Sequence, residues 1–135
     1  MIHMLRGASD LAQFILEMYP GKVVEIGAGF EDGVLSRLGP SAFATDIEER
    51  RLGSRLALAD DIFYPRKEIY EGAVLLYSIR PPIELQMAIG RLASKIGADV
   101  LIRPIGDEVA ELPGFSRVLI NRGEARFYLF KSGLF

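Results

Sequence analysis

The stretch that decides the fold is Lys22-Val23-Val24-Glu25-Ile26-Gly27-Ala28-Gly29-Phe30. It reads as an apolar strand with one acid near its end, then a glycine turn, then the start of a helix. A second apolar run, residues 42–45, ends at Asp46. This succession is typical of the cofactor half of a nucleotide-binding α/β fold. The sequence therefore predicts an adenosine-containing small-molecule ligand, either S-adenosylmethionine or a dinucleotide such as NAD.

The rest of the chain alternates between helical and extended patterns. A first helix is expected to begin after Ser9 as its N-cap and to end at Pro20-Gly21, and Pro81-Pro82 can open a second one that Gly97 closes. The other expected elements are a helix over residues 32–38, strands over residues 56–59, 73–79 and 100–102, and a hairpin with strands over residues 116–120 and 126–130. This order predicts an α/β fold, with one three-layer Rossmann-like domain over residues 1–135, a mostly parallel sheet and a C-terminal antiparallel hairpin.

The composition narrows the classes of function. The 16 basic and 18 acidic residues give a net charge of -2, which argues against a broad nucleic-acid-binding face. The chain has no cysteine, and its one histidine is His3, so thiolate or histidine zinc sites and cysteine or serine–histidine catalysis are excluded. No run approaches the roughly 20 apolar residues of a membrane span, and no signal peptide is recognisable. We therefore expect a cytoplasmic protein with no membrane partner and no metal.

The segment Glu25-Ile26-Gly27-Ala28-Gly29 resembles the first motif of class I S-adenosylmethionine-dependent methyltransferases, which reads acid, any residue, Gly, any residue, Gly. The resemblance implies that Asp46 binds the ribose and that Asp60 or Asp61 lies on the adenine side. It also implies a methyltransferase-type sheet, which ends with an inserted antiparallel strand. Three positions depart from the pattern. Glu31 stands where a third glycine is expected. Arg80 and Ile83 flank Pro-Pro where amino-methyltransferases carry Asp or Asn before it and an aromatic residue after it.

A second stretch, residues 77–86, reads Tyr-Ser-Ile-Arg-Pro-Pro-Ile-Glu-Leu-Gln. It resembles a small archaeal family that carries only the label uncharacterised protein family 0146. This resemblance implies a fold and no activity.

Seven residues form the candidate cofactor site: Glu25, Gly27, Ala28, Gly29, Asp46, Asp60 and Asp61. The glycines would let the backbone approach a ligand, and the helix start after them would offer free amides. Each carboxylate also has a structural alternative, since Glu25 can bond loop amides, Asp46 can cap the next turn and the Asp60-Asp61 pair can be solvated. Glu31 and Asp32 at the helix start would repel the diphosphate of NAD, which favours adenosylmethionine, or they merely complement the helix dipole.

Two strands end in the same way, the first in Ile79-Arg80-Pro81 and the second in Ile102-Arg103-Pro104. Ligands of open α/β sheets bind beyond the carboxyl ends of the strands. Arg80 and Arg103 could therefore bind a phosphate or carboxylate of a substrate by their guanidinium forks. Alternatively, each arginine pairs with a local acid such as Glu84 or Asp107 and only fixes a loop.

These observations lead to three functional hypotheses. The first is an adenosylmethionine-binding protein, a methyltransferase acting on an anionic small molecule or an RNA end. The second is a regulatory module that binds NAD or a nucleotide without turnover. The third is a subunit that keeps the fold with an empty pocket. The sequence indicates no catalytic base and no oligomeric state.

Overall fold

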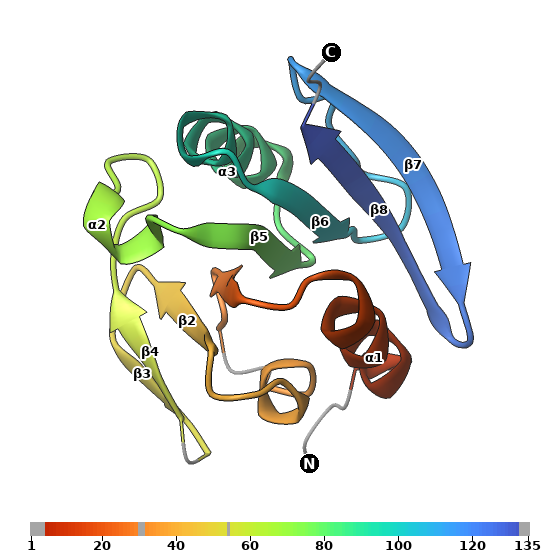
Figure 1. Ribbon diagram of the computed structural model, residues 1–135, viewed down its shortest axis with the longest axis horizontal. Helices are drawn as coiled ribbons and strands as arrows, with labels where there is room; N and C mark the ends of the chain where they lie inside the picture. The colour runs from red at the N-terminus through yellow and green to blue at the C-terminus, as the bar shows by residue number, and fades with distance from the viewer. Residues whose placement is uncertain (1–4, 30–31, 54, 133–135) are drawn as a thin grey trace.

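A sheet of eight strands lies between two layers of helices in the computed structural model, which describes residues 5–29, 32–53 and 55–132 (Figure 1). The strand order is β3-β4-β2-β1-β5-β6-β8-β7. The elements are α1 (Ala8–Met18), β1 (Lys22–Ile26), the short 3-10 helix η1 (Leu35–Arg37), β2 (Ala42–Asp46), β3 (Arg50–Leu52), β4 (Arg55–Ala59), α2 (Lys67–Tyr70), β5 (Ala73–Ile79), α3 (Ile83–Ile96), β6 (Asp99–Arg103), β7 (Phe115–Arg122) and β8 (Ala125–Ser132).

The centre of the sheet is parallel and both of its edges are antiparallel. β1 pairs in parallel with β2 and β5, and the parallel order continues to β4 on one side and β6 on the other. The C-terminal hairpin of β7 and β8 adds to β6 in the antiparallel sense. The predicted three-layer α/β class, with its mostly parallel sheet and closing hairpin, is confirmed.

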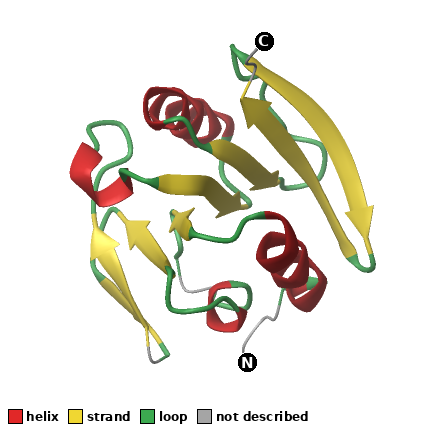
Figure 2. Cartoon of the chain, viewed as in Figure 1, coloured by secondary structure: helices red, strands yellow, loops and turns green. Residues whose placement is uncertain are grey.

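Helices lie on both faces of the sheet (Figure 2), and each face carries its own apolar core. On one face, Leu11 and Phe14 of α1 pack over the sheet, and the Phe14 ring meets Phe127 edge-on with centroids 5.0 Å apart. On the other face, Ile89 and Leu92 of α3 pack over the same strands. β1 and β5 each contribute buried side chains to both cores, and burial stabilises the fold by about 1.5–3 kcal/mol for each large side chain.

Two local predictions were wrong, and one strand was missed. Residues 32–38 form no α-helix and only η1 forms, since Gly33 and Ser36 lower the helix propensity of a short segment that Gly39-Pro40 ends. α1 begins one residue before Ser9, after Gly7, whose φ of 80° is left-handed. A Cβ at Gly7 would lie 2.6 Å from the backbone of Glu124, so only glycine allows this contact with the C-terminal hairpin. The short strand β3 was not anticipated.

The parallel strands bring their carboxyl ends to one edge of the sheet. Five residues singled out from the sequence lie at these ends: Asp46 and Arg103 are the last residues of β2 and β6, and Gly27, Asp60 and Arg80 directly follow β1, β4 and β5. The topology therefore gathers the candidate residues that sequence reasoning had placed on separate elements. None of the helices in the described ranges has the length and apolar character needed to cross a bilayer.

Candidate functional site

The glycine turn after β1 is tied to the end of β2. The amides of Gly27 and Ala28 donate to the Thr45 carbonyl at 2.9 and 3.2 Å, and the Gly29 amide donates to Oδ2 of Asp46 at 2.6 Å. Gly27 and Gly29 have left-handed φ values of 68° and 58°, which favour glycine. Apart from its chain neighbours, no described residue has an atom within 4 Å of a Cβ added to Gly29. The outer side of the turn is therefore open to a ligand.

Asp46 is both a brace and an available acceptor. Its two oxygens accept the amides of Gly29 and Ile47, each at 2.6 Å, and Nε of Arg50 lies 3.4 Å from Oδ2. A carboxylate offers about four acceptor positions. The two amides and the guanidinium leave room for one further donor, such as a ribose hydroxyl. Asp46 also lines the pocket described below.

The structure separates the roles of Asp60 and Asp61. The Asp60 side chain is 2% exposed, and it accepts the Tyr70 hydroxyl at 2.6 Å and the Arg66 amide at 3.1 Å. Burial, and then this hydrogen bond, raise the pKa of Tyr70. Asp61 is half-buried and accepts the Phe63 amide at 3.0 Å. Asp60 thus fixes the loop after β4, and Asp61 keeps acceptor capacity toward the pocket.

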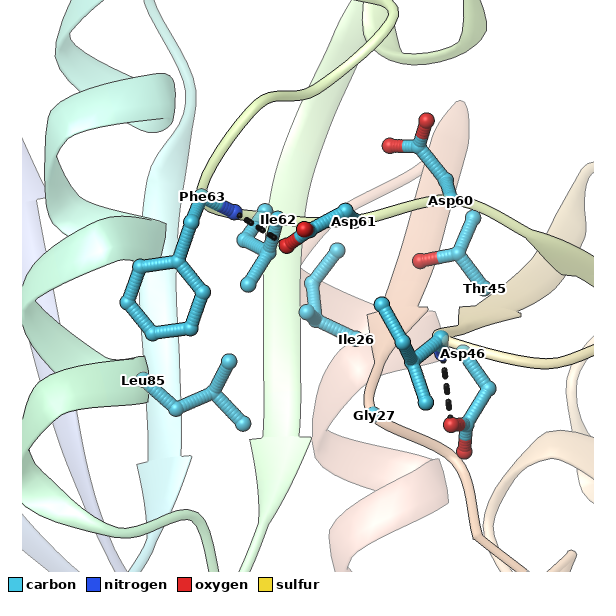
Figure 3. Close-up of a pocket in the computed structure, with 10 residues that line it drawn as sticks. Ile26, Gly27, Thr45, Asp46, Asp60, Asp61, Ile62, Phe63 and Leu85 are labelled. Carbon is cyan, nitrogen blue, oxygen red and sulfur yellow. Dashed lines mark hydrogen bonds between the residues drawn. The ribbon is translucent and has the colours of Figure 1, made fainter.

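A pocket of about 340 Å³ opens at these strand ends (Figure 3). In Figure 3 the Phe63 ring and the Leu85 side chain lie together on one side of it, with Gly27 and Asp46 on the other. Its lining includes two large apolar side chains that remain exposed, Ile47 at 62% and Phe63 at 48%. The lining residues are Ile26, Gly27, Thr45, Asp46, Ile47, Asp60, Asp61, Ile62, Phe63 and Leu85. Apolar walls with a few acceptors suit a flat ring that carries an amino group.

Glu25 lies deeper than the pocket and is not among its lining residues. It is 1% exposed and accepts the Tyr77 hydroxyl at 2.7 Å. Burial, and then the charge of Glu25, raise the pKa of Tyr77 well above its ordinary value. The amides of residues 27–29 bond to the end of β2 instead. Among described residues, Glu25 therefore links β1 to β5.

Arg80 and Arg103 lie side by side at the ends of β5 and β6. The Arg80 amide donates to the Arg103 carbonyl at 2.6 Å. Nη1 of Arg103 is covered and has no hydrogen-bond partner, and burial together with the nearby Arg80 charge lowers the Arg103 pKa. The alternative pairing with Glu84 or Asp107 is not found within the described ranges, where ion pairs involve Arg6, Arg50, Arg66 and Arg122.

Sequence reasoning missed the side chains that complete these contacts. Tyr70 and Tyr77 had no assigned role, although each holds one of the predicted acids. Ile47 and Phe63 line the pocket and were overlooked. Their positions in the sequence could have indicated this role, because Ile47 and Phe63 each follow an acid near a strand end by one or two residues. Glu31 lies outside the described residues, which contain no group of three His, Cys, Asp or Glu side chains placed to hold a metal.

Comparison with known proteins identifies the family. Residues 8–132 match the family model described as Uncharacterised protein family (UPF0146). The chain belongs to this family. A UPF0146 protein of Archaeoglobus fulgidus is 44% identical over 127 residues, which cover 90% of this chain and 93% of the relative. One from Methanothermobacter thermautotrophicus is 37% identical, with 89% and 92% covered. The family membership predicted from residues 77–86 is confirmed.

Two solved structures with the same fold are described as methyltransferases. The candidate methyltransferase yhhF from Escherichia coli aligns with a TM-score of 0.63 and 12% identity, covering 99% of this chain and 89% of its own. Magnesium protoporphyrin IX methyltransferase from Synechocystis PCC 6803, solved with bound S-adenosylmethionine, aligns at 0.55 and 12% identity, covering 91% and 76%. At such identities the likeness concerns the fold, and it confirms the predicted methyltransferase type.

Proposed function

We propose that the UPF0146 chain binds S-adenosylmethionine in the pocket at the ends of β1, β2 and β4. The observation that carries the proposal is the lining of this pocket, in which exposed Ile47 and Phe63 flank acceptors supplied by Asp46 and Asp61. An adenine ring would pack between the apolar side chains, with its amino group toward Asp61. The ribose hydroxyls would reach Asp46, and the methionine part would pass over the open side of Gly29.

The local backbone favours adenosylmethionine over NAD. A dinucleotide site sets its diphosphate against the N-terminus of an α-helix that follows the glycine turn. Within the described residues, the first helical element after Gly29 is the three-residue η1. Such a short turn offers little helix dipole to a diphosphate. Adenosylmethionine carries no phosphate and does not need a helix N-terminus at this position.

The finer part of the proposal is methyl transfer to an anionic acceptor at the ends of β5 and β6. Bound adenosylmethionine supplies a methyl group on a sulfonium, which an in-line nucleophile takes while the sulfur keeps the bonding electron pair. The protein's contribution would be alignment, since this displacement needs geometry more than a strong base. Arg80 and Arg103 occupy the edge from which an acceptor would approach, one and two strands away from Gly27.

Ligand titrations with the purified protein test cofactor binding. Adenosylmethionine or adenosylhomocysteine should raise Tm, with about 2.7 kcal/mol of added stability at 100 times Kd. Asp46→Ala should weaken calorimetric affinity by roughly 1.5–3 kcal/mol, or about 10- to 150-fold, because a charged acceptor is lost. Glu48→Ala, which changes an exposed acid of the loop after β2, is the matched control. A clear shift by NAD with none by either adenosyl compound would replace the proposal with a regulatory nucleotide-binding module.

A further inference from the structure

The ends of β5 and β6 carry two guanidinium groups that no described carboxylate neutralises. Ile79 pairs with Arg103 in the parallel register, and Arg80 follows Ile79 directly. Neighbouring strands lie about 4.8 Å apart, so the backbones of Arg80 and Arg103 are neighbours across the sheet. Neither arginine has a partner among the ion pairs or side-chain hydrogen bonds of the described residues. Two like charges thus stand together at the carboxyl edge of the sheet.

Both arginines are held at a cost to stability. Arg80 has a φ of 56°, the one non-glycine φ in the left-handed region among the described residues. Nη1 of Arg103 is removed from water without a replacement hydrogen bond. Backbone strain and unsatisfied buried donors are unfavourable, and they concentrate where a ligand uses them. Arg80 therefore destabilises the fold in two ways, through its own backbone strain and through repulsion between its positive charge and that of Arg103.

A buried side chain locks the two arginine-bearing loops together. Nε2 of Gln86 donates to the Pro81 carbonyl at 3.1 Å and to the Glu108 carbonyl at 2.8 Å. Its Oε1 accepts the Ala110 amide at 2.8 Å, and the residue is fully buried. Pro81 belongs to the loop after β5, whereas Glu108 and Ala110 follow β6. The edge is preorganised, which reduces the cost of ordering it around a ligand.

We propose that Arg80 and Arg103 bind a phosphomonoester group of the methyl acceptor. A phosphomonoester carries about -1.5 to -2 charges near neutral pH, which matches two guanidinium groups better than a carboxylate does. Guanidinium forks pair with phosphate oxygens in a bidentate way. α3 begins shortly after Arg80 and directs its N-terminus to the same edge, and its residue Leu85 lines the adenosine pocket. The proposal rests on the proposed function only in placing this phosphate beside a methyl donor.

The surrounding charges favour a small phosphorylated molecule over an RNA end. The loop after β6 carries three exposed acids, Asp107, Glu108 and Glu111. The chain as a whole has a net charge of -2. A polyanion that extends past the arginines would be repelled by these acids, whereas a single phosphate would meet only the arginine pair.

Titration with inorganic phosphate and glycerol 3-phosphate tests the site without any cofactor. The readout is the Nε–Hε resonances of the arginines at constant ionic strength, with chloride as the non-specific anion. We expect saturable shifts at Arg80 and Arg103 and at least tenfold weaker binding in Arg80→Met/Arg103→Met. The control Arg91→Met/Arg126→Met removes the same charge from exposed positions on α3 and β8 and should change affinity less than twofold. If the double variant does not fold, Arg103→Lys keeps the charge, loses the fork and should still weaken binding at least threefold.

Each other outcome overturns a defined part of the inference. No saturable shift at either arginine, or equal losses in both double variants, would remove the phosphate site. A 5′-phosphorylated RNA that binds more than tenfold tighter than glycerol 3-phosphate would replace the small molecule with RNA. If Arg80→Met/Arg103→Met weakens adenosylhomocysteine but spares 5′-methylthioadenosine, the arginines hold the cofactor's own carboxylate instead. Phosphate binding without adenosylhomocysteine binding would contradict the proposed function and leave the anion site standing.

Discussion

Replacing Arg80 by glycine should stabilise the protein. Arg80 adopts a φ of 56° between β5 and the Pro81-Pro82 start of α3. A side chain in this left-handed region crowds the following carbonyl, and glycine has no Cβ to do so. The position is exposed, so the substitution removes no buried contact. We expect the gain to come from relief of backbone strain and from the loss of a positive charge next to Arg103.

The strain can be isolated by comparing Arg80→Gly with Arg80→Ala, since both remove the same charge. Left-handed geometry costs a non-glycine residue about 1–2 kcal/mol. The greater freedom of glycine in the unfolded chain offsets roughly 0.5–1 kcal/mol of that relief. The glycine variant should therefore exceed the alanine variant by about 0.5–1 kcal/mol. For a chain of 135 residues, an unfolding entropy of about 2.1 cal/mol/K per residue converts this difference to a Tm gain of about 2–4 °C.

Differential scanning calorimetry of the two variants, with urea unfolding as a second measure, gives the comparison. The matched control is Lys95→Gly against Lys95→Ala, on the exposed side of the last turn of α3, where glycine should be the less stable by up to about 1 kcal/mol. Equal stability of Arg80→Gly and Arg80→Ala would refute the strain at this position. The φ of Arg80 would then no longer indicate that the fold gives up stability to place an arginine at this edge.

Four further substitutions probe the pocket and its supports. Tyr77→Phe should lower the free energy of unfolding in urea by about 1.5–3 kcal/mol, because buried Glu25 loses a donor, and by only about 0.5–1.5 kcal/mol in a Glu25→Gln background. Asp60→Ala should lower Tm, since Tyr70 and Arg66 lose their acceptor. Asp61→Ala should instead weaken adenosylhomocysteine binding about tenfold in calorimetry, with little change in Tm. The reverse result would exchange the roles of the two aspartates. Gly29→Ala should cost about 1 kcal/mol of stability from its φ of 58° and weaken the same ligand, although the added methyl meets no described residue beyond its chain neighbours; unchanged affinity would exclude close approach at the turn.

The centre of the fold could be predicted because its signals are local and redundant. β5 coincides with the predicted residues 73–79, since a continuous apolar run bounded by Gly72 and the Pro81-Pro82 pair has few other readings. The edge formed by β3 gave a weaker signal. β3 reads Arg-Arg-Leu, and it is a strand only because it pairs with β4. A tertiary contact of this kind leaves no period in a three-residue segment.

The sequence could predict where the candidate site lies, but not which role each of its residues has. The carboxyl ends of parallel strands meet at one edge of a sheet, so the sequence alone could predict that Gly27 and Asp46 lie close together. Asp60 and Asp61 are adjacent in sequence, and only the fold sets one against Tyr70 and turns the other toward the pocket. The φ of Arg80 was equally hidden, since a residue before proline is expected to be extended. Such strain is imposed by the surrounding structure and carries no local signature.

The charges along the carboxyl edge of the sheet give a bound ligand a direction. Asp46 and Asp61 lie at the ends of β2 and β4, Arg80 and Arg103 lie at the ends of β5 and β6, and β1 with its glycine turn separates the two pairs. The hydroxyls and amino group of adenosine are donors and match the acidic side, whereas an anionic acceptor matches the arginines. A methyl donor in this orientation would present its reactive carbon near the end of β1. The phosphate proposed at the arginines would then lie about one to two strand spacings away, or roughly 5–10 Å. Under the proposed function, we therefore expect a compact acceptor, with its nucleophile only a few bonds from its phosphate.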